Sequence, residues 1–130
     1  MALPEADLQY LSTLGLEYEV TAEAAMTCVV LRSWPLPAGY ATDSADLLVR
    51  LPTGYPDTAP DMWWFAPAVT LAGGGSPPAT EVVETYRGRT WQRWSRHLQP
   101  GQWKSGMDGL QTYLALVTAD LARHGPVVAR

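Results

Sequence analysis

The stretch TGYPDTAPDMWWFA, residues 53–66, joins a turn-rich connector to a short aromatic strand. Pro56 and Pro60 fall in its first half, and proline has no backbone N–H to donate within a sheet. The aromatic run that includes Trp63 and Trp64 favours a strand. Successive side chains of a strand point to opposite faces, so one Trp belongs to the core and the other lies against another element or solvent.

Three segments before this stretch have the pattern of strands. Residues 45–52 form an apolar run that Pro52 ends, and residues 25–37 form a longer run that Pro35 stops. Residues 16–23 are a first strand or the lead-in to one. Together with the aromatic strand, they predict an antiparallel meander.

A helix is predicted at each end of the chain. Residues 3–15 begin with Pro4, which suits a first helical turn, and they end at Gly15. A second helix, from about Gly106 to Arg123, shows apolar residues at helical spacing. Its expected caps and stop are Ser105 and Asp108 at the start and Gly125-Pro126 at the end. This order predicts an α+β fold with the second helix packed on one face of the sheet.

The totals are those of one domain. The chain has 130 residues, of which 47% are hydrophobic, so we treat residues 1–130 as a single unit with its own core. No apolar run reaches the length of a membrane span, and no signal peptide begins the chain, so we expect a cytoplasmic protein without a membrane partner. The only cysteine, Cys28, lies in an apolar strand, where we expect a buried structural thiol. We expect neither a metal nor a cofactor.

The region after the aromatic strand is harder to interpret. Residues 67–81 are rich in Gly and Pro and predict an exposed loop. In residues 82–103 the apolar residues follow neither the spacing of a helix nor that of a strand. Within the latter, TWQRWSRHLQPGQW places Trp91 and Trp94 three residues apart among arginines. Such a pair is typical of plain packing, but it also suits a helical face or a stacking surface.

Basic residues are concentrated in one part of this acidic chain, whose net charge is -4. Residues 85–107 hold five of the nine Lys and Arg residues and none of the 13 Asp and Glu residues. A local positive field of this kind indicates a docking surface for an acidic partner, unless it is only a solvated face. We expect four arginines either to bind such a partner or to stabilise an oxyanion, the negatively charged oxygen of a reaction intermediate. They are Arg87, Arg89, Arg93 and Arg96.

The order of these segments resembles the ubiquitin-conjugating enzyme fold. In that family a strand leads into a Tyr-Pro turn, a second proline, an aromatic-rich strand, a long active-site segment and a Trp before a helix. The matching residues here are Tyr55-Pro56, Pro60 and Trp103. The whole chain is most similar to the prokaryotic ubiquitin-conjugating-enzyme-like family of type E. Its members occur in bacterial operons with an activating enzyme, a ubiquitin-like protein and a peptidase.

The resemblance implies partners and a site. The expected partners are an activating enzyme and a ubiquitin-like modifier, in a bacterial system with a role in antiphage defence. The catalytic cysteine of the eukaryotic family commonly lies eight residues before the Trp that precedes the helix, and that position here is Ser95. The expected packing residues around it are Trp94, Trp103, Tyr55 and Pro56.

Serine is a weaker nucleophile than cysteine and needs a base, for which His97 is the nearest candidate. In an extended segment Ser95 and His97 point the same way. The family's His-Pro-Asn motif, whose Asn supports the oxyanion, is missing, and the chain contains no Asn. Arg93 and Arg96 are the side chains that could take over this task.

The residues and the resemblance together leave three functions open. The first is a carrier that accepts the modifier's C-terminus as an oxyester on Ser95 and passes it to an amine. The second is an inactive relative that keeps the fold and binds the activating enzyme or the modifier as an adaptor. A distant third is a module for single-stranded nucleic acid, favoured by interleaved Arg and aromatic residues but opposed by the acidic total charge.

Overall fold

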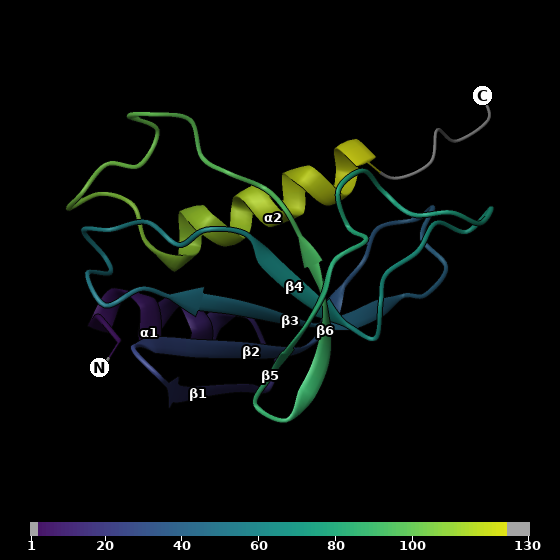
Figure 1. Ribbon diagram of the computed structural model, residues 1–130. Coiled ribbons are helices and arrows are strands. Elements are labelled where there is room, and N and C mark those ends of the chain that lie inside the picture. The colour runs from purple at the N-terminus through teal and green to yellow at the C-terminus, as the bar shows by residue number, and fades with distance from the viewer. Residues whose placement is uncertain (1–2, 125–130) are drawn as a thin grey trace.

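The computed structural model describes residues 3–124, in which two helices cover one face of a six-stranded antiparallel sheet (Figure 1). The sheet order is β1-β2-β3-β4-β6-β5. The elements are α1 (Glu5–Thr13), β1 (Tyr18–Glu23), β2 (Met26–Pro35), β3 (Ser44–Leu51), β4 (Trp63–Ala66), β5 (Val83–Tyr86), β6 (Arg89–Trp94) and α2 (Leu110–His124). The predicted α+β fold, with its N-terminal helix, meander and C-terminal helix, is confirmed.

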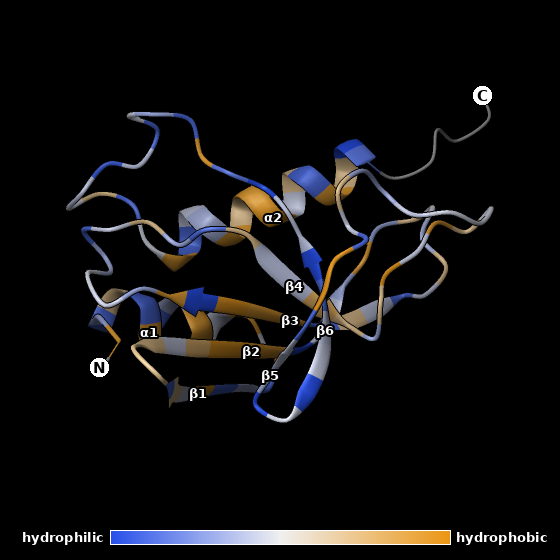
Figure 2. Cartoon of the chain, in the orientation of Figure 1, coloured by the Kyte–Doolittle hydropathy of each residue, from blue (hydrophilic) through white to orange (hydrophobic). Residues whose placement is uncertain are grey.

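Strand alternation divides the interior into two layers. One face of the sheet, with Trp63 and Trp94, packs against α1 and α2. The other face holds a smaller cluster that includes Cys28, Trp64 and Trp91. Figure 2 shows the hydrophobic residues along β2 and β3 that supply much of both layers. Trp63 and Trp64 therefore lie on opposite faces, as the sequence predicts, and both are buried.

A hairpin occupies part of the region that had no clear period. β5 and β6 pair from Val83↔Gln92 to Tyr86↔Arg89, and the two-residue turn between them is Arg87-Gly88. Both turn residues have positive φ, 55° and 73°, a conformation that matches the twist of a hairpin. Because β6 also pairs with β4, the hairpin extends the meander and leaves β5 at the edge.

The second helix begins later than the sequence predicts, at Leu110 and not near Gly106. Its first N–H is capped from another helix, because the Leu110 N–H donates to Asp7 Oδ1 of α1 at 3.1 Å. A Cβ at Gly109 would lie 2.8 Å from the same oxygen, so glycine permits this approach. The predicted caps have other partners: Ser105 Oγ donates to Asp57, and Asp108 accepts from the Lys104 N–H. The predicted stop at Gly125-Pro126 lies outside the described residues.

The Gly- and Pro-rich segment is only partly the exposed loop that was expected. Its middle is exposed, but Val69, Pro77 and Thr80 are buried. The buried amide of Gln92 on β6 accepts from the Val69 N–H at 2.8 Å and donates to the Val69 carbonyl at 3.1 Å. Both ends of the segment are therefore held against the sheet. Neither helix within residues 3–124 combines the length and apolarity that crossing a membrane requires.

Candidate functional site

Ser95 lies directly after β6, at the start of a long excursion without regular structure that leads to α2 (Figure 1). Its side chain is half-buried. Its N–H donates to the Ala79 carbonyl at 3.0 Å, which fixes the backbone beside the end of the Gly- and Pro-rich segment. Its hydroxyl oxygen accepts a hydrogen bond from Arg93 Nε at 3.1 Å. The serine therefore lies outside the sheet, half-buried, with a cation at its oxygen.

Arg93 is held in place by an acid from the neighbouring strand. Its guanidinium lies 3.3 Å from Glu84 on β5. The same Glu84 accepts from Trp64 Nε1 at 2.9 Å, so the carboxylate is itself fixed to β4. Arg93 and Ser95 are two residues apart at the end of a strand, and this spacing puts both side chains on one side. The result is a short chain of contacts from Trp64 to the Ser95 hydroxyl.

His97 points elsewhere. Its Nδ1 lies 2.8 Å from Asp61 Oδ1, and both side chains are more than half exposed. The backbone supports this pairing, because the Met62 N–H donates to the Arg96 carbonyl at 3.1 Å. The structure thus brings His97 to Asp61, whereas the partner of the Ser95 hydroxyl among the described residues is Arg93.

Arg96 joins the segment after β6 to the second helix. Its Nε donates to Asp120 on α2 at 2.8 Å, and a terminal nitrogen donates to the Pro78 carbonyl at 2.9 Å. Its guanidinium carbon also lies 5.0 Å from the centre of the buried Trp94 ring. Arg96 is therefore directed toward α2, away from the Ser95 hydroxyl that Arg93 contacts.

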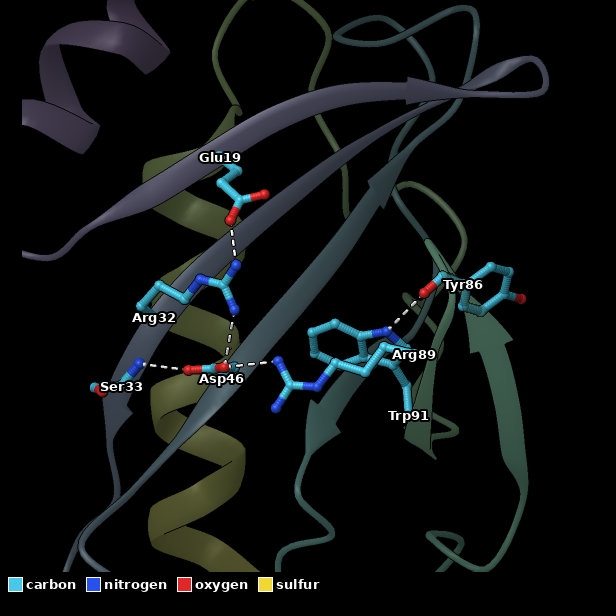
Figure 3. A network of polar contacts seen from close by, with 7 residues as sticks. All are labelled: Glu19, Arg32, Ser33, Asp46, Tyr86, Arg89 and Trp91. Carbon is cyan, nitrogen blue, oxygen red and sulfur yellow. Dashed lines mark hydrogen bonds and ion pairs between the residues drawn. The ribbon is translucent and has the colours of Figure 1, made fainter.

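Of the remaining predicted arginines, Arg89 lies on the same face of the sheet as Arg93, away from the helices, and Arg87 lies in the hairpin turn. Arg89 donates to Asp46 of β3 at 2.7 Å and lies over the Trp91 ring (Figure 3). Arg87 is exposed in the turn, where its backbone N–H donates to Glu23 at 2.9 Å. The four arginines thus do not share one face, and three of them pair with acids distant in the sequence.

Asp46 is the centre of the network in Figure 3. It accepts from Arg89, from Arg32 at 3.2 Å and from the Ser33 N–H at 2.8 Å. Burial raises the pKa of this carboxyl, but the hydrogen bonds from Arg89, Ser33 and Arg32 outweigh burial and leave the pKa below its ordinary value. The network lies at a β-bulge, in which two residues of β2, Arg32 and Ser33, lie opposite the single residue Asp46 of β3.

Three of the four predicted packing residues, Tyr55, Pro56 and Trp103, lie beside the start of α2, whereas the buried Trp94 packs on Phe65 of β4. Trp103 Nε1 donates to the Pro56 carbonyl at 2.8 Å, and the Trp103 ring packs on Tyr55 and on Tyr113 of α2. The buried Tyr55 hydroxyl donates to Asp7 at 2.5 Å. The Tyr-Pro turn therefore connects the segment after β6 to both helices.

A cleft opens between the segment after β6 and α2. Its volume is about 320 Å³. The side chains that line it include Trp63, Arg96, His97, Leu116, Asp120 and Arg123. The sequence pattern did not point to Asp61, Glu84 or Asp120 as functional neighbours. Asp61 and Asp120 are distant in the chain from the residues they contact, and Glu84 comes close through the β5–β6 hairpin, which the sequence did not reveal.

Cys28 has the buried environment that its sequence predicts. It is 0% exposed, and burial raises the pKa of its thiol. Trp91 and Trp94 are buried as well, at 2% and 0% exposure, so neither ring is free to stack on a nucleotide base. Within residues 3–124, no three His, Cys, Asp or Glu side chains gather closely enough to hold a metal ion.

Comparison with known proteins identifies one relationship. The family model described as "Prokaryotic E2 family E" matches residues 3–124, which is nearly the whole chain. No curated protein matches the chain, and no solved structure matches it either. The match confirms the resemblance that the Tyr-Pro turn and the following elements indicate.

Proposed function

Because the chain belongs to the prokaryotic E2 family E, we propose that it works in ubiquitin-like conjugation as a carrier of the modifier. In this proposal an activating enzyme delivers the modifier's C-terminal acyl group to Ser95. The acyl group then passes from Ser95 to an amine of a target protein. The family supports conjugation in general, and the contacts of Ser95 support the choice of this residue.

The observation that carries the proposal is the hydrogen bond from Arg93 Nε to Ser95 Oγ. A guanidinium is always charged and can only donate, so it stabilises negative charge that develops on the serine oxygen. Glu84 and Trp64 fix Arg93 before any partner arrives, which avoids reorganisation during the reaction. Arg93 thereby supports the nucleophile, in a chain that has no Asn for the family's oxyanion role.

The transfer is an exchange of acyl partners. Ser95 Oγ attacks the activated carbonyl carbon of the modifier, and a C–O bond forms as the bond to the activating enzyme breaks. The hydroxyl proton leaves with the departing group. A second attack, by an amine, breaks the C–O bond, forms an amide and returns a proton to Ser95.

The partners are the activating enzyme and the modifier. Arg87 is exposed at the tip of the β5–β6 hairpin, and its side chain forms no ion pair among residues 3–124. We assign to it the contact with an acidic partner surface. Arg87→Glu is expected to slow association at low salt and to weaken its dependence on salt. If association is unchanged, the hairpin tip is not part of the interface.

An adaptor remains the second candidate, and His97 favours it. His97 pairs with Asp61 through Nδ1, and among residues 3–124 the Ser95 hydroxyl forms its hydrogen bond with Arg93 and none with His97. An adaptor needs the fold and its surfaces but no reactive hydroxyl. His97→Ala separates the roles, because it slows ester formation if His97 acts as a base and leaves it unchanged if His97 only orders the loop.

The proposal is tested by incubating the protein with its activating enzyme, the mature modifier and ATP. A covalent adduct is expected, and Ser95→Ala should abolish it. Ser76→Ala is the matched control, because Ser76 is exposed in the Gly-rich segment and should leave the adduct intact. If Ser95→Ala binds the activating enzyme normally and the adduct persists, the serine is not the carrier.

A further inference from the structure

The cleft between the segment after β6 and α2 has the make-up of a small ligand site. Its volume of about 320 Å³ lies at the lower end of the range for ligand pockets. Apolar side chains, Leu98, Leu116 and Ala119, line it together with the charged Arg96, Asp120 and Arg123. Six of the eleven lining residues are Arg, His, Asp or Gln, so the cleft combines apolar contacts with several groups that form hydrogen bonds.

Two hydrogen-bond donors on its lining residues have no partner. Among residues 3–124, three buried side-chain nitrogen or oxygen atoms lack a hydrogen bond: Arg50 Nε, Trp63 Nε1 and one terminal nitrogen of Arg96. Two of these three belong to residues that line the cleft. A buried polar atom without a partner is rare in folded proteins and costly. Both nitrogens can only donate a hydrogen bond, so a ligand that satisfies them must supply an acceptor.

We propose that this cleft binds a small carboxylate ligand, whose oxygens accept from the Arg96 guanidinium and from Trp63 Nε1. One carboxylate oxygen accepts from the free terminal nitrogen of Arg96 and the other from Trp63 Nε1, and the short stem of the ligand fits against the apolar side chains of the lining. The inference is independent of ester formation on Ser95, because the Ser95 hydroxyl is bonded to Arg93 and does not line the cleft.

Asp120 restricts the ligand to a single negative charge. Its carboxylate lines the cleft and already pairs with Arg96 at 2.8 Å and with His124 at 3.4 Å. A doubly charged phosphate would be repelled by Asp120 more strongly than a carboxylate would. Entry also requires space to open above the two donors. Gln99 and Gln102 are exposed residues of the irregular segment at this cleft, and opening it there breaks the hydrogen bond from the Gln99 N–H to Gln102 Oε1.

The direct test follows the indole N–H resonances of the unmodified protein during titration with N-acetylalanine. A saturable shift of the Trp63 resonance is expected, while the Trp64 resonance, whose N–H is bonded to Glu84 on the other face, stays in place. Trp63→Phe assigns the resonance and keeps the ring packing. The neutral amide of N-acetylalanine should produce no saturable shift at the same concentrations.

Variants locate the binding. Arg96→Gln should weaken binding about tenfold or more, because a charge-assisted hydrogen bond is lost. Arg96→Lys should weaken it less. Arg32→Gln, on the opposite face of the sheet, and Ser95→Ala should leave it unchanged. The proposal is overturned if the Trp63 resonance does not shift, if the amide binds as well as the acid, or if inorganic phosphate at mildly alkaline pH binds more tightly.

Discussion

Arg93 Nε and Ser95 Oγ lie 3.1 Å apart at the point where β6 ends, and the hydrogen bond between them places a permanent cation on the candidate nucleophile. The bond depends on strand geometry, which sends side chains two residues apart to the same side. It also depends on Glu84, which binds the guanidinium from β5. In the proposed transfer this cation stabilises the charge that develops on the serine oxygen, while the hydroxyl proton leaves with the departing group.

Arg93→Gln should therefore slow adduct formation on Ser95. A donor to a developing negative charge commonly contributes about 10²–10³ in rate, and we expect a loss toward the lower end because the amide of Gln still donates. Arg93→Lys should retain more activity than Arg93→Gln. The measurement is the initial rate of adduct formation at saturating activating enzyme. Equal rates for Arg93→Gln and the unmodified protein would show that the contact has no catalytic part.

The Tyr55 hydroxyl should contribute to the stability of both helices. Tyr55→Phe removes a donor from the buried Asp7 carboxylate, which also caps α2. We expect the free energy of unfolding to fall by roughly 1–3 kcal/mol, the usual cost of leaving a buried acceptor short of a partner. Tyr18→Phe is the control, since Tyr18 is 37% exposed. Similar urea midpoints for the two variants would contradict this role of Asp7.

Stability should depend on the charge of Asp46. Because its folded pKa lies below the ordinary value of about 3.9, its contribution is present above about pH 4 and is lost as the pH falls through the folded pKa. Asp46→Asn should lower the free energy of unfolding at neutral pH by roughly 1 kcal/mol, since its arginine partners are partly exposed.

The pH dependence supplies the check on this assignment. Urea unfolding from neutral pH to about pH 3 should give a shallower loss of stability for Asp46→Asn than for the unmodified protein. Asp43→Asn changes an exposed acid whose side chain forms no hydrogen bond within the described part of the chain, and it should keep the original slope. The same slope for all three proteins would exclude Asp46 as a source of the pH dependence.

Cysteine labelling distinguishes the buried thiol from the candidate site. The Cys28 side chain is fully buried and burial raises its thiol pKa, so a thiol reagent should react with it slowly in the native protein and faster in denaturant. In a Ser95→Cys variant a second thiol should react promptly. Position 95 is partly exposed, and the Arg93 cation beside it favours the reactive thiolate. Rapid labelling of Cys28 in the native protein would contradict its burial.

The sequence predicts β2 and β3 because apolar runs fill them and prolines mark their ends, and β4 because of its aromatic run. It left residues 16–23, which contain β1, as a strand or a lead-in, since no proline ends them. It left the β5–β6 hairpin unassigned, since the Arg87-Gly88 turn lies within a run of arginines and aromatic residues that has no clear period. The start of α2 was placed too early because its cap, Asp7, lies on the other helix. A contact between the two ends of a chain leaves no local pattern.

The candidate site was predictable only in part. Counting back from Trp103 points to Ser95 without saying where it lies in the fold, and the structure places it half-buried just after β6. The spacing from Ser95 to Arg93 is a local feature. The charges were harder to foresee, because Asp46, Glu84 and Asp120 reach the arginines from three other elements and offset much of their field. The partner of His97, Asp61, lies before β4 in the chain and comes close only through tertiary pairing.

The central claim is an ester on Ser95, and the chemical lability of the adduct tests it most directly. After incubation with the activating enzyme, the modifier and ATP, the adduct should survive reducing agent and break under mild hydroxide or alkaline hydroxylamine. Ser95→Cys should form an adduct that reducing agent removes, because a thioester replaces the ester. Lys104→Arg, which removes the only lysine, should change neither result. An adduct that resists hydroxylamine, or none at all while binding to the activating enzyme is retained, would contradict the carrier function and leave the adaptor.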